Sequence, residues 1–227
     1  MATSGTFTYQ RTAGDLTLQA FVRAGVPKTD LTSQHMADAQ AEANLMMASL
    51  SNQVPHLWTS ETYPVTLSDG TATYALPERI IDIQVAYIST TSGGVTTDRV
   101  IGPISTAEYA SLSNKTTEGA PTAYWFDKQI TPSIVLWPTP DQTYTLNLRC
   151  LSRFQDTLLV NGTDVEIPYR FWDAFCWGLA FRLAAIYKPE KAQSLGQIAE
   201  AELQKALDQD TDAVPVRVVA NVGGYFR

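Results

Sequence analysis

The sequence predicts an α+β protein, in which a helical bundle formed by N- and C-terminal helices carries an inserted antiparallel β domain and an extended C-terminal tail. Apolar residues recur at helical spacing near both ends of the chain. The middle is rich in Thr, Tyr, Val and Ile and is interrupted by Gly and Pro, which is typical of short strands and turns. We therefore expect half-bundles at 1–52 and 167–212, the β domain with a short helix at 53–166, and a docking tail at 213–227.

Composition narrows the classes of function. The 227 residues are 44% hydrophobic and 10% aromatic, as in a folded globular protein. Lys and Arg number 16 and Asp and Glu number 23, so the net charge is −7. The basic residues are scattered, whereas DNA binding needs them clustered to neutralise phosphates. An acidic surface would instead repel DNA and keep it from adhering.

The first expected helix follows a capping sequence. Thr12 can accept a hydrogen bond from an amide at the helix start, and Asp15 lies near the positive end of the helix dipole. Gly25 and Pro27 then end the helix, because neither residue continues helical geometry easily.

A second helix is expected from a cap at Asp30 or Thr32 to about Ser51. Its larger apolar and alanine positions lie close together on the helix surface: Met36, Ala39, Ala43, Met46 and Leu50. We expect this stripe to face the core, and the many alanines to let neighbouring helices approach closely.

The central region predicts several short strands. We expect strands at 65–67, 72–76, 81–87, 123–128, 134–137 and 144–150. Alternation predicts one buried face at Ile81, Ile83, Val85 and Tyr87, and again at Tyr144, Leu146, Leu148 and Cys150. Turns are expected at 68–70 and 92–94, and the capping box at 105–108 starts a short helix.

The segment 170–187 predicts a helix that is apolar on nearly every side. Its large residues are candidates for the core or for contacts between subunits: Phe171, Trp172, Phe175, Trp177 and Phe181. Asp173, Gly178 and Arg182 interrupt the run, so we expect protein and not a membrane to cover it. Pro189 opens a last helix with an expected buried stripe of Leu195, Ile198, Ala199, Leu203, Ala206 and Leu207.

The tail has the pattern of a docking segment. Its valines alternate with Pro215 and Arg217, and a Gly-Gly pair precedes two aromatic residues. A frayed terminus is the ordinary alternative, but such apolar residues are unfavourable in water. We expect docking on a neighbour, as an added strand or otherwise, through Val214, Val216, Val218, Tyr225 and Phe226.

Residues for chemistry are sparse. His35 and His56 are the only histidines, and neither lies in a metal-binding or catalytic spacing; GxSxG and phosphate-binding glycine motifs are absent. Cys150 and Cys176 are expected to be buried, reduced thiols, since no secretory signal precedes them. Residues 208–212 copy half of a calcium loop without its glycine and closing glutamate. We expect no enzyme activity, no metal and no cofactor.

Two other functions remain open at this stage. Exposed aromatic rings could bind sugars by stacking, which would make the chain a glycan-binding tail or tail-fibre module; the candidates are Trp58, Tyr63, Tyr74, Trp125 and Trp137. Core or interface packing is the more ordinary role for such rings. A hydrolase built around His35 or His56 is the third possibility.

Short motifs in a fixed order resemble those of phage adaptor proteins. VTLSDGTATYALP at 65–77 is similar to the "V-x-x-G-x-x-x-Y-x-L-P" pattern of that family. ISTAEY at 104–109 resembles the start of its short central helix, and GAPTAY at 119–124 resembles "G-x-P-x-x-Y". LWPTPD at 136–141 resembles "L-x-P-x-P-D", and Ile167-Pro168 precedes the apolar helix.

The resemblance implies a head-to-tail connector of a short-tailed phage. Such adaptors form a dodecameric ring beneath the portal, extend the DNA channel and provide a platform for tail nozzle or tail fibre proteins. The expected location is the neck of the virion, after assembly in the host cytoplasm, with genomic DNA passing without sequence-specific binding and no membrane involved. The family has no known catalytic residues, so the resemblance assigns none.

Overall fold

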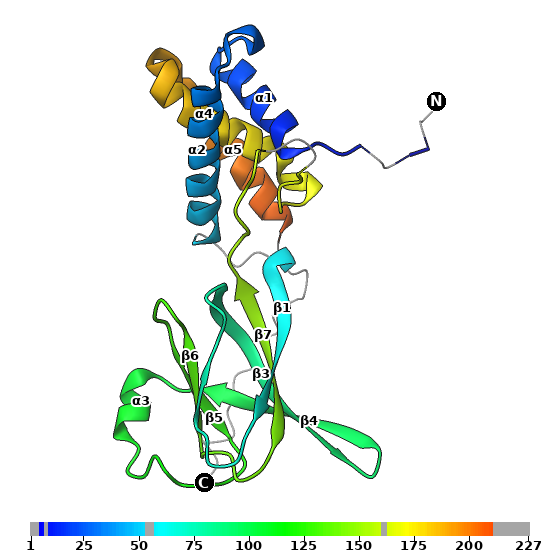
Figure 1. Cartoon of the computed structure of the whole chain (residues 1–227), viewed down its shortest axis with the longest axis vertical. Coiled ribbons are helices and arrows are strands. Elements are labelled where there is room, and N and C mark those ends of the chain that lie inside the picture. The colour runs from blue at the N-terminus through cyan, green and yellow to red at the C-terminus, as the bar shows by residue number, and fades with distance from the viewer. Residues whose placement is uncertain (1–4, 7–8, 53–56, 160–162, 211–227) are drawn as a thin grey trace, which may run out of the picture.

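The computed structural model describes residues 5–6, 9–52, 57–159 and 163–210, and it has an elongated shape with helices at one end and strands at the other (Figure 1). Each end has its own hydrophobic core: the first is formed by helices and by Phe154, Val165 and Ile167, and the second is formed by strands. The α+β fold class is therefore confirmed. Independent folding of 53–166 as a domain stays a prediction.

Within the described residues, the helical unit contains four α-helices and three short 3-10 helices. The α-helices are α1 (Ala13–Ala24), α2 (Ser33–Ser51), α4 (Trp172–Tyr187) and α5 (Pro189–Gln209). The 3-10 helices are η1 (Lys28–Asp30), η2 (Leu57–Thr59) and η3 (Tyr169–Phe171). Helices from both ends of the sequence lie side by side in this unit (Figure 1).

The boundaries of α1 follow the predicted signals. The Thr12 hydroxyl accepts a hydrogen bond from the Asp15 amide at 3.2 Å, and the Asp15 carboxylate accepts from the Thr12 amide at 3.4 Å, which completes the capping box. Gly25 ends the helix at φ +90°, a conformation that glycine adopts without steric cost. The Val26 amide donates to the Phe21 carbonyl at 2.9 Å and closes this helix end.

The start of α2 distinguishes between the two predicted caps. Thr32 caps the helix, whereas Asp30 lies in η1. His35 occupies the position that glutamate usually fills in a capping box, because its Nδ1 accepts from the Thr32 amide at 3.3 Å. Of the expected stripe, Ala39 and Ala43 are fully buried.

α4 is the central helix of the bundle and packs against α1, α2 and α5. This arrangement explains why its sequence is apolar on nearly every side. Among the helices that the structure describes, none combines the length and the hydropathy needed to cross a bilayer.

α5 begins with Pro189 at its first position, as predicted. Its buried residues are Leu195, Ala199 and Ala206. The expected burial of Ile198 is wrong, since this residue is 40% exposed. α5 lies on the outside of the bundle and packs mainly against α4, so its buried arc is narrower than the sequence stripe.

The described part of the β unit forms one sheet of seven strands in the order β1-β7-β3-β4-β5-β6-β2. The strands are β1 (Ser60–Leu67), β2 (Thr73–Ala75), β3 (Ile80–Ser92), β4 (Val95–Pro103), β5 (Ala123–Asp127), β6 (Ser133–Trp137) and β7 (Tyr144–Ser152). All neighbours are antiparallel except β4 and β5, which pair in parallel at only two positions. The short helix α3 (Thr106–Ser111), with the expected capping box, connects β4 to β5.

The turn after β1 joins opposite edges of the sheet. The sequence predicts strands on both sides of this turn, and both form, but β1 pairs with β7 and β2 pairs with β6. The Tyr74 hydroxyl accepts from the Ser68 amide at 2.8 Å, and the Gly70 amide donates to the Pro140 carbonyl at 2.9 Å. These bonds hold the two edges near each other, so the sheet curls.

The predicted buried face of β3 is confirmed at Ile83 and wrong at Val85. Two register irregularities against β7, between Ile80 and Asp82 and between Ile83 and Val85, shift the alternation of side chains. The buried residues are Ile80, Ile83, Ala86 and Ile88, whereas Val85 is 44% exposed. β7 has the alternation predicted for it, with Tyr144, Leu146, Leu148 and Cys150 buried.

Candidate interaction surfaces

The five aromatic residues predicted for α4 and the residue before it do not form one surface. Phe171 and Phe175 are buried in the helical core. Trp172 and Trp177 are half-buried. Trp172 lies close to Tyr9 in the segment before α1, and Trp177 lies close to Arg23 of α1. Phe181 is 38% exposed and borders a groove between α2 and α5. Two different surfaces of α4 are therefore candidates for contacts with other molecules.

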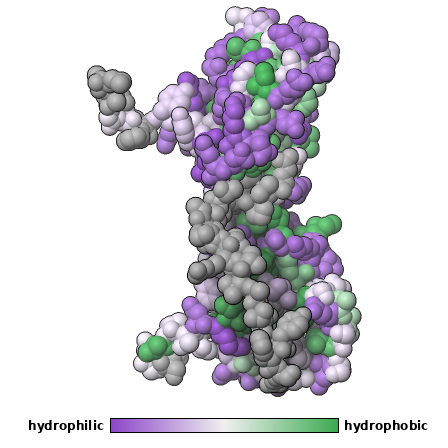
Figure 2. Space-filling view, turned by 180° about the vertical axis from the view of Figure 1, so that it is seen from behind, coloured by the Kyte–Doolittle hydropathy of each residue, from purple (hydrophilic) through white to green (hydrophobic). Residues whose placement is uncertain are grey.

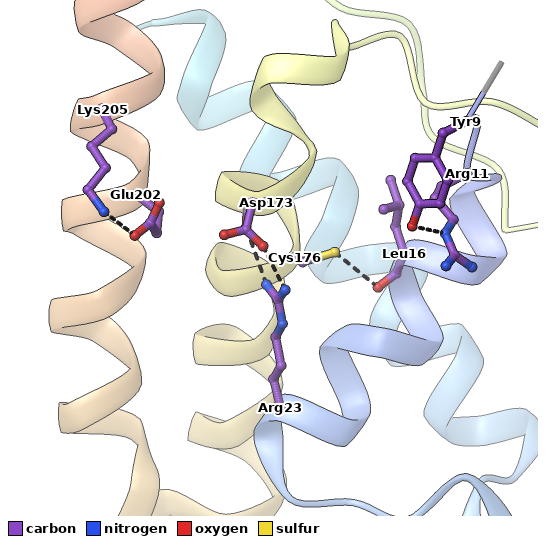
Figure 3. A network of polar contacts seen from close by, with 8 residues as sticks. All are labelled: Tyr9, Arg11, Leu16, Arg23, Asp173, Cys176, Glu202 and Lys205. Carbon is purple, nitrogen blue, oxygen red and sulfur yellow. Dashed lines mark hydrogen bonds and ion pairs between the residues drawn. The ribbon is translucent and has the colours of Figure 1, made fainter. Parts of the chain in front are cut away.

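The first surface lies between α1 and the start of α4, and we call it the arginine surface. It surrounds a hollow of about 480 Å³ and consists of Tyr9, Arg11, Arg23, Tyr169, Arg170 and Trp172. Figure 3 shows Arg23 of α1 reaching Asp173 of α4, with Tyr9 and Arg11 beside each other farther along. The Arg23–Asp173 ion pair is 2.6 Å long, and Arg23 also lies 4.2 Å from the ring centroid of Trp177.

The arginine surface carries only a small excess of positive charge on a chain of net charge −7. Three arginines line the hollow, but Arg23 pairs with Asp173 and Arg170 pairs with Asp210, so two of the three positive charges are offset. The Arg11 Nε donates to the Tyr9 hydroxyl at 2.6 Å. Tyr9 is 60% exposed and Tyr169 is 70% exposed. Arg, Tyr and Trp are enriched at the energetic centres of protein interfaces, so this composition favours an acidic protein partner.

The second surface is an apolar groove of about 570 Å³ between α2 and α5, with α4 as its floor. Met46, Leu50, Phe175, Phe181 and Leu203 supply most of its apolar walls. Ser49, Arg182, Gln197 and Glu200 supply polar groups to its lining.

Two glycines set the shape of the apolar groove. A Cβ at Gly178 would lie 2.7 Å from the Met46 sulfur, so glycine lets the side chain from α2 lie directly on α4. A Cβ at Gly196 would lie 3.2 Å from the Phe181 ring, so the α5 backbone and this ring are in close contact. The glycine that interrupts the apolar run of α4 therefore serves helix packing.

The third surface is a two-stranded ribbon formed by the outer parts of β3 and β4, which projects from the β unit (Figure 1). Gly93 and Gly94 both have positive φ, as the turn joining these strands requires. Val95 and Val100 are more than 60% exposed, at 67% and 69%. β4 pairs with β5 only at Gly102 and Pro103.

One face of the helical unit is largely polar (Figure 2). On the face seen in Figure 2, hydrophilic residues predominate over the helical unit and apolar residues form small patches between them.

The aromatic residues considered for sugar binding are engaged within the protein. The Trp58 ring lies 4.5 Å from Phe171 and 5.7 Å from Phe154, measured between ring centroids. Trp125 stacks on Tyr109, and the Trp137 indole donates to the Asn114 carbonyl at 3.1 Å. The Arg79 guanidinium lies over the Tyr63 ring, and the Tyr74 hydroxyl donates to the Thr71 carbonyl. These contacts favour the packing role over an open stacking platform.

Both thiols are buried, and burial disfavours the reactive thiolate form. Burial raises the pKa of Cys150 to about 12 and that of Cys176 to about 11. Cys150 lies in the β core, whereas Cys176 lies in the helical core and directs its sulfur toward the Leu16 carbonyl at 3.5 Å (Figure 3). Both are free cysteines, as the sequence predicts.

His35 has a structural position. It caps α2 and stacks on Tyr187 with ring centroids 4.5 Å apart. Within the described ranges, no group of three or more His, Cys, Asp or Glu side chains is arranged to hold a metal ion. His56 and the predicted docking residues Val214, Val216, Val218, Tyr225 and Phe226 lie outside the described residues.

The arginine surface was not predicted from the sequence. Arg11, Arg23 and Arg170 are scattered along the chain, and no local motif connects them. They meet only because α1 packs on α4. The local sequence signal is a tyrosine close to two of these arginines: Tyr9 lies two residues before Arg11, and Tyr169 directly precedes Arg170.

Comparison with known proteins identifies the family. The chain matches none of the curated proteins with which it was compared. One similar solved structure is titled "Neck of empty GTA particle computed with C6 symmetry"; identity is 11%, 76% of this chain and 80% of that chain are covered, and the TM-score of 0.26 is too low to carry an argument. Residues 11–219 match the family model described as SU10 adaptor protein, which confirms the resemblance to phage adaptors. The chain belongs to the SU10 adaptor protein family.

Proposed function

We propose that this protein is a structural head-to-tail adaptor, which forms a ring under the phage portal, extends the DNA channel and provides the attachment platform for tail proteins. The observation that carries the proposal is the family match over residues 11–219. The role is that of a building block without catalysis, and its place is the neck of the virion.

The surfaces on the helical unit support a ring. The arginine surface includes residues of α1, whereas the apolar groove lies between α2 and α5, so one subunit presents two different surfaces beside the same central helix. Contacts between unlike surfaces of identical subunits produce closed rings when the rotation closes. We propose such contacts, with twelve subunits as in the phage adaptors that the sequence resembles.

Charge supports passage of DNA without sequence-specific binding. The net charge is −7, and an acidic channel lining repels the phosphate backbone. The proposal also includes the tail, residues 213–227. There we propose that Val214, Val216, Val218, Tyr225 and Phe226 bind a neighbouring component such as the portal or a tail protein.

Charge reversal on the arginine surface tests the assembly role. Arg11→Glu keeps the fold, because this guanidinium is at the surface, but it places a negative charge where an acidic partner binds. We expect sedimentation of the variant with portal to show loss of the complex formed by wild type. The control is Lys28→Glu, the same charge change on exposed η1. Equal complex formation by all three proteins would exclude the arginine surface from binding to the portal.

A further inference from the structure

The apolar groove leaves part of the central helix without a cover. α1, α2 and α5 pack against α4, yet the groove between α2 and α5 leaves α4 partly exposed at Gly178 and Phe181. Removing apolar surface from water is favourable by about 25 cal/mol per Å². An apolar segment that reached this groove would therefore be stabilised there.

The C-terminal segment begins near one end of the groove. α5, which forms one wall, ends at Gln209. The next side chain, Asp210, is 2% exposed and forms an ion pair of 2.5 Å with Arg170. Arg170 immediately precedes Phe171, which also lines the groove. The ion pair thus fixes the start of the C-terminal segment close to the end of the groove where α4 begins.

The length of this segment is sufficient for it to fold back. Residues 211–227 can span up to about 55 Å when extended, at roughly 3.3 Å per residue. The α5 wall of the groove from Gly196 to Leu203 is only about 10 Å long, at 1.5 Å per helical residue.

The chemistry of the segment matches the groove. It contains alternating valines and two terminal aromatic residues, which suit apolar walls. Its Arg217 lies between Val216 and Val218, and Glu200 in the groove lining offers the opposite charge. Ser49 and Gln197 in the same lining can bond to the backbone of an extended segment.

We propose that residues 213–227 occupy the apolar groove of their own chain before the subunit assembles. A tethered segment is present at an effective concentration in the millimolar range, so it fills its own groove ahead of a free partner. The docking role proposed above then requires these residues to leave the groove when a partner binds. This inference concerns the unassembled subunit and does not depend on the proposed ring.

Photo-crosslinking within the full chain tests the proposal. Leu203 is replaced by benzoylphenylalanine, and chains labelled with ¹⁴N and ¹⁵N are mixed before irradiation. We expect crosslinks to residues 213–217 and to the tryptic peptide 218–227, each pair carrying a single isotope; crosslinks to residues 206–209 are left out because these residues follow position 203 on α5 itself. The matched control places the same photoreactive residue at exposed Gln193 of α5, where the yield should be several times lower.

The other outcomes overturn the proposal. Crosslinked pairs of mixed isotope would show that a second copy supplies the segment, and crosslinks to other peptides would show a different occupant. A Leu203 yield no higher than the Gln193 yield would show that the segment lies elsewhere. Repeating the measurement with the photoreactive residue at Met46, on the opposite wall, guards against a local effect of substitution in α5. Val216→Asp should abolish the crosslink, whereas Asn221→Asp should keep it.

Discussion

At the scale of single residues, Glu61 connects three strands of the β unit. Its carboxylate in β1 accepts hydrogen bonds from Arg79, immediately before β3, at 2.9 Å and from the Ser152 hydroxyl of β7. These bonds favour the charged form, so Arg79 first and Ser152 second hold the pKa of Glu61 below its usual value of 4.5. The contribution to stability is therefore complete above that value and is lost as the pH falls through the lowered pKa.

Glu61→Gln tests this contribution. We expect the variant to be less stable than wild type at pH 7 by less than about 1 kcal/mol, because the ion pair is partly exposed. Below about pH 4.5 the difference should shrink, since wild type loses the contribution and the variant does not. Urea unfolding at several pH values measures this difference in the free energy of unfolding, and Glu78→Gln at an exposed position is the control. A difference that stays constant down to pH 2 would contradict this assignment.

The two thiols provide a second test at the residue scale. With the pKa of Cys150 at about 12 and that of Cys176 at about 11, almost no reactive thiolate exists in the folded protein at pH 8. We expect a thiol reagent to label neither cysteine until denaturant is added. Ile130→Cys, at a position that is 91% exposed, should react at once and serves as control. Rapid labelling of the folded wild type would show that one core opens readily.

At the scale of elements, caps were predictable because they depend on a few adjacent residues. The Thr12 and Ser105 capping boxes formed as expected, since each requires only a hydroxyl and a carboxylate three residues apart. The face of β3 was not predictable in this way. Its irregularities arise from pairing with β7, which lies more than fifty residues later in the chain. Alternation of Ile81, Ile83, Val85 and Tyr87 carries no signal of that partner.

Thr12→Ala tests the contribution of the cap to α1. Loss of the hydroxyl leaves the Asp15 amide without its hydrogen bond, which should lower the free energy of unfolding by about 1 kcal/mol. Thr12→Ser keeps a hydroxyl at the same place and should stay close to wild type. Chemical unfolding followed by circular dichroism measures both. Equal destabilisation by alanine and serine would mean that the threonine methyl group, and not the cap, is responsible.

At the scale of the whole molecule, the sequence predicted the division between helices and strands but not the surfaces. Helix and strand periodicity is local, so both cores could be anticipated from the order of segments. The arginine surface and the apolar groove instead depend on how α1, α2 and α5 are placed around α4. Their residues come from N-terminal and C-terminal helices, and the periodicity of one segment gives no information about its contacts with a distant segment.

The elongated shape suits an adaptor between two larger assemblies. The helical unit carries the arginine surface and the apolar groove, whereas the projecting β3–β4 ribbon lies in the β unit, away from the helices (Figure 1). This separation supports the proposed ring, because a subunit with candidate surfaces at different positions has room for neighbouring subunits and for further components at the same time.

Electron microscopy of this protein mixed with the portal from the same genome tests the adaptor role most directly. The account predicts a second ring of this chain stacked on the narrow end of the portal, with density for residues 213–227 against a neighbouring component. A bare portal, together with a chain that remains monomeric at high concentration, would contradict the account and would bring the glycan-binding alternative forward.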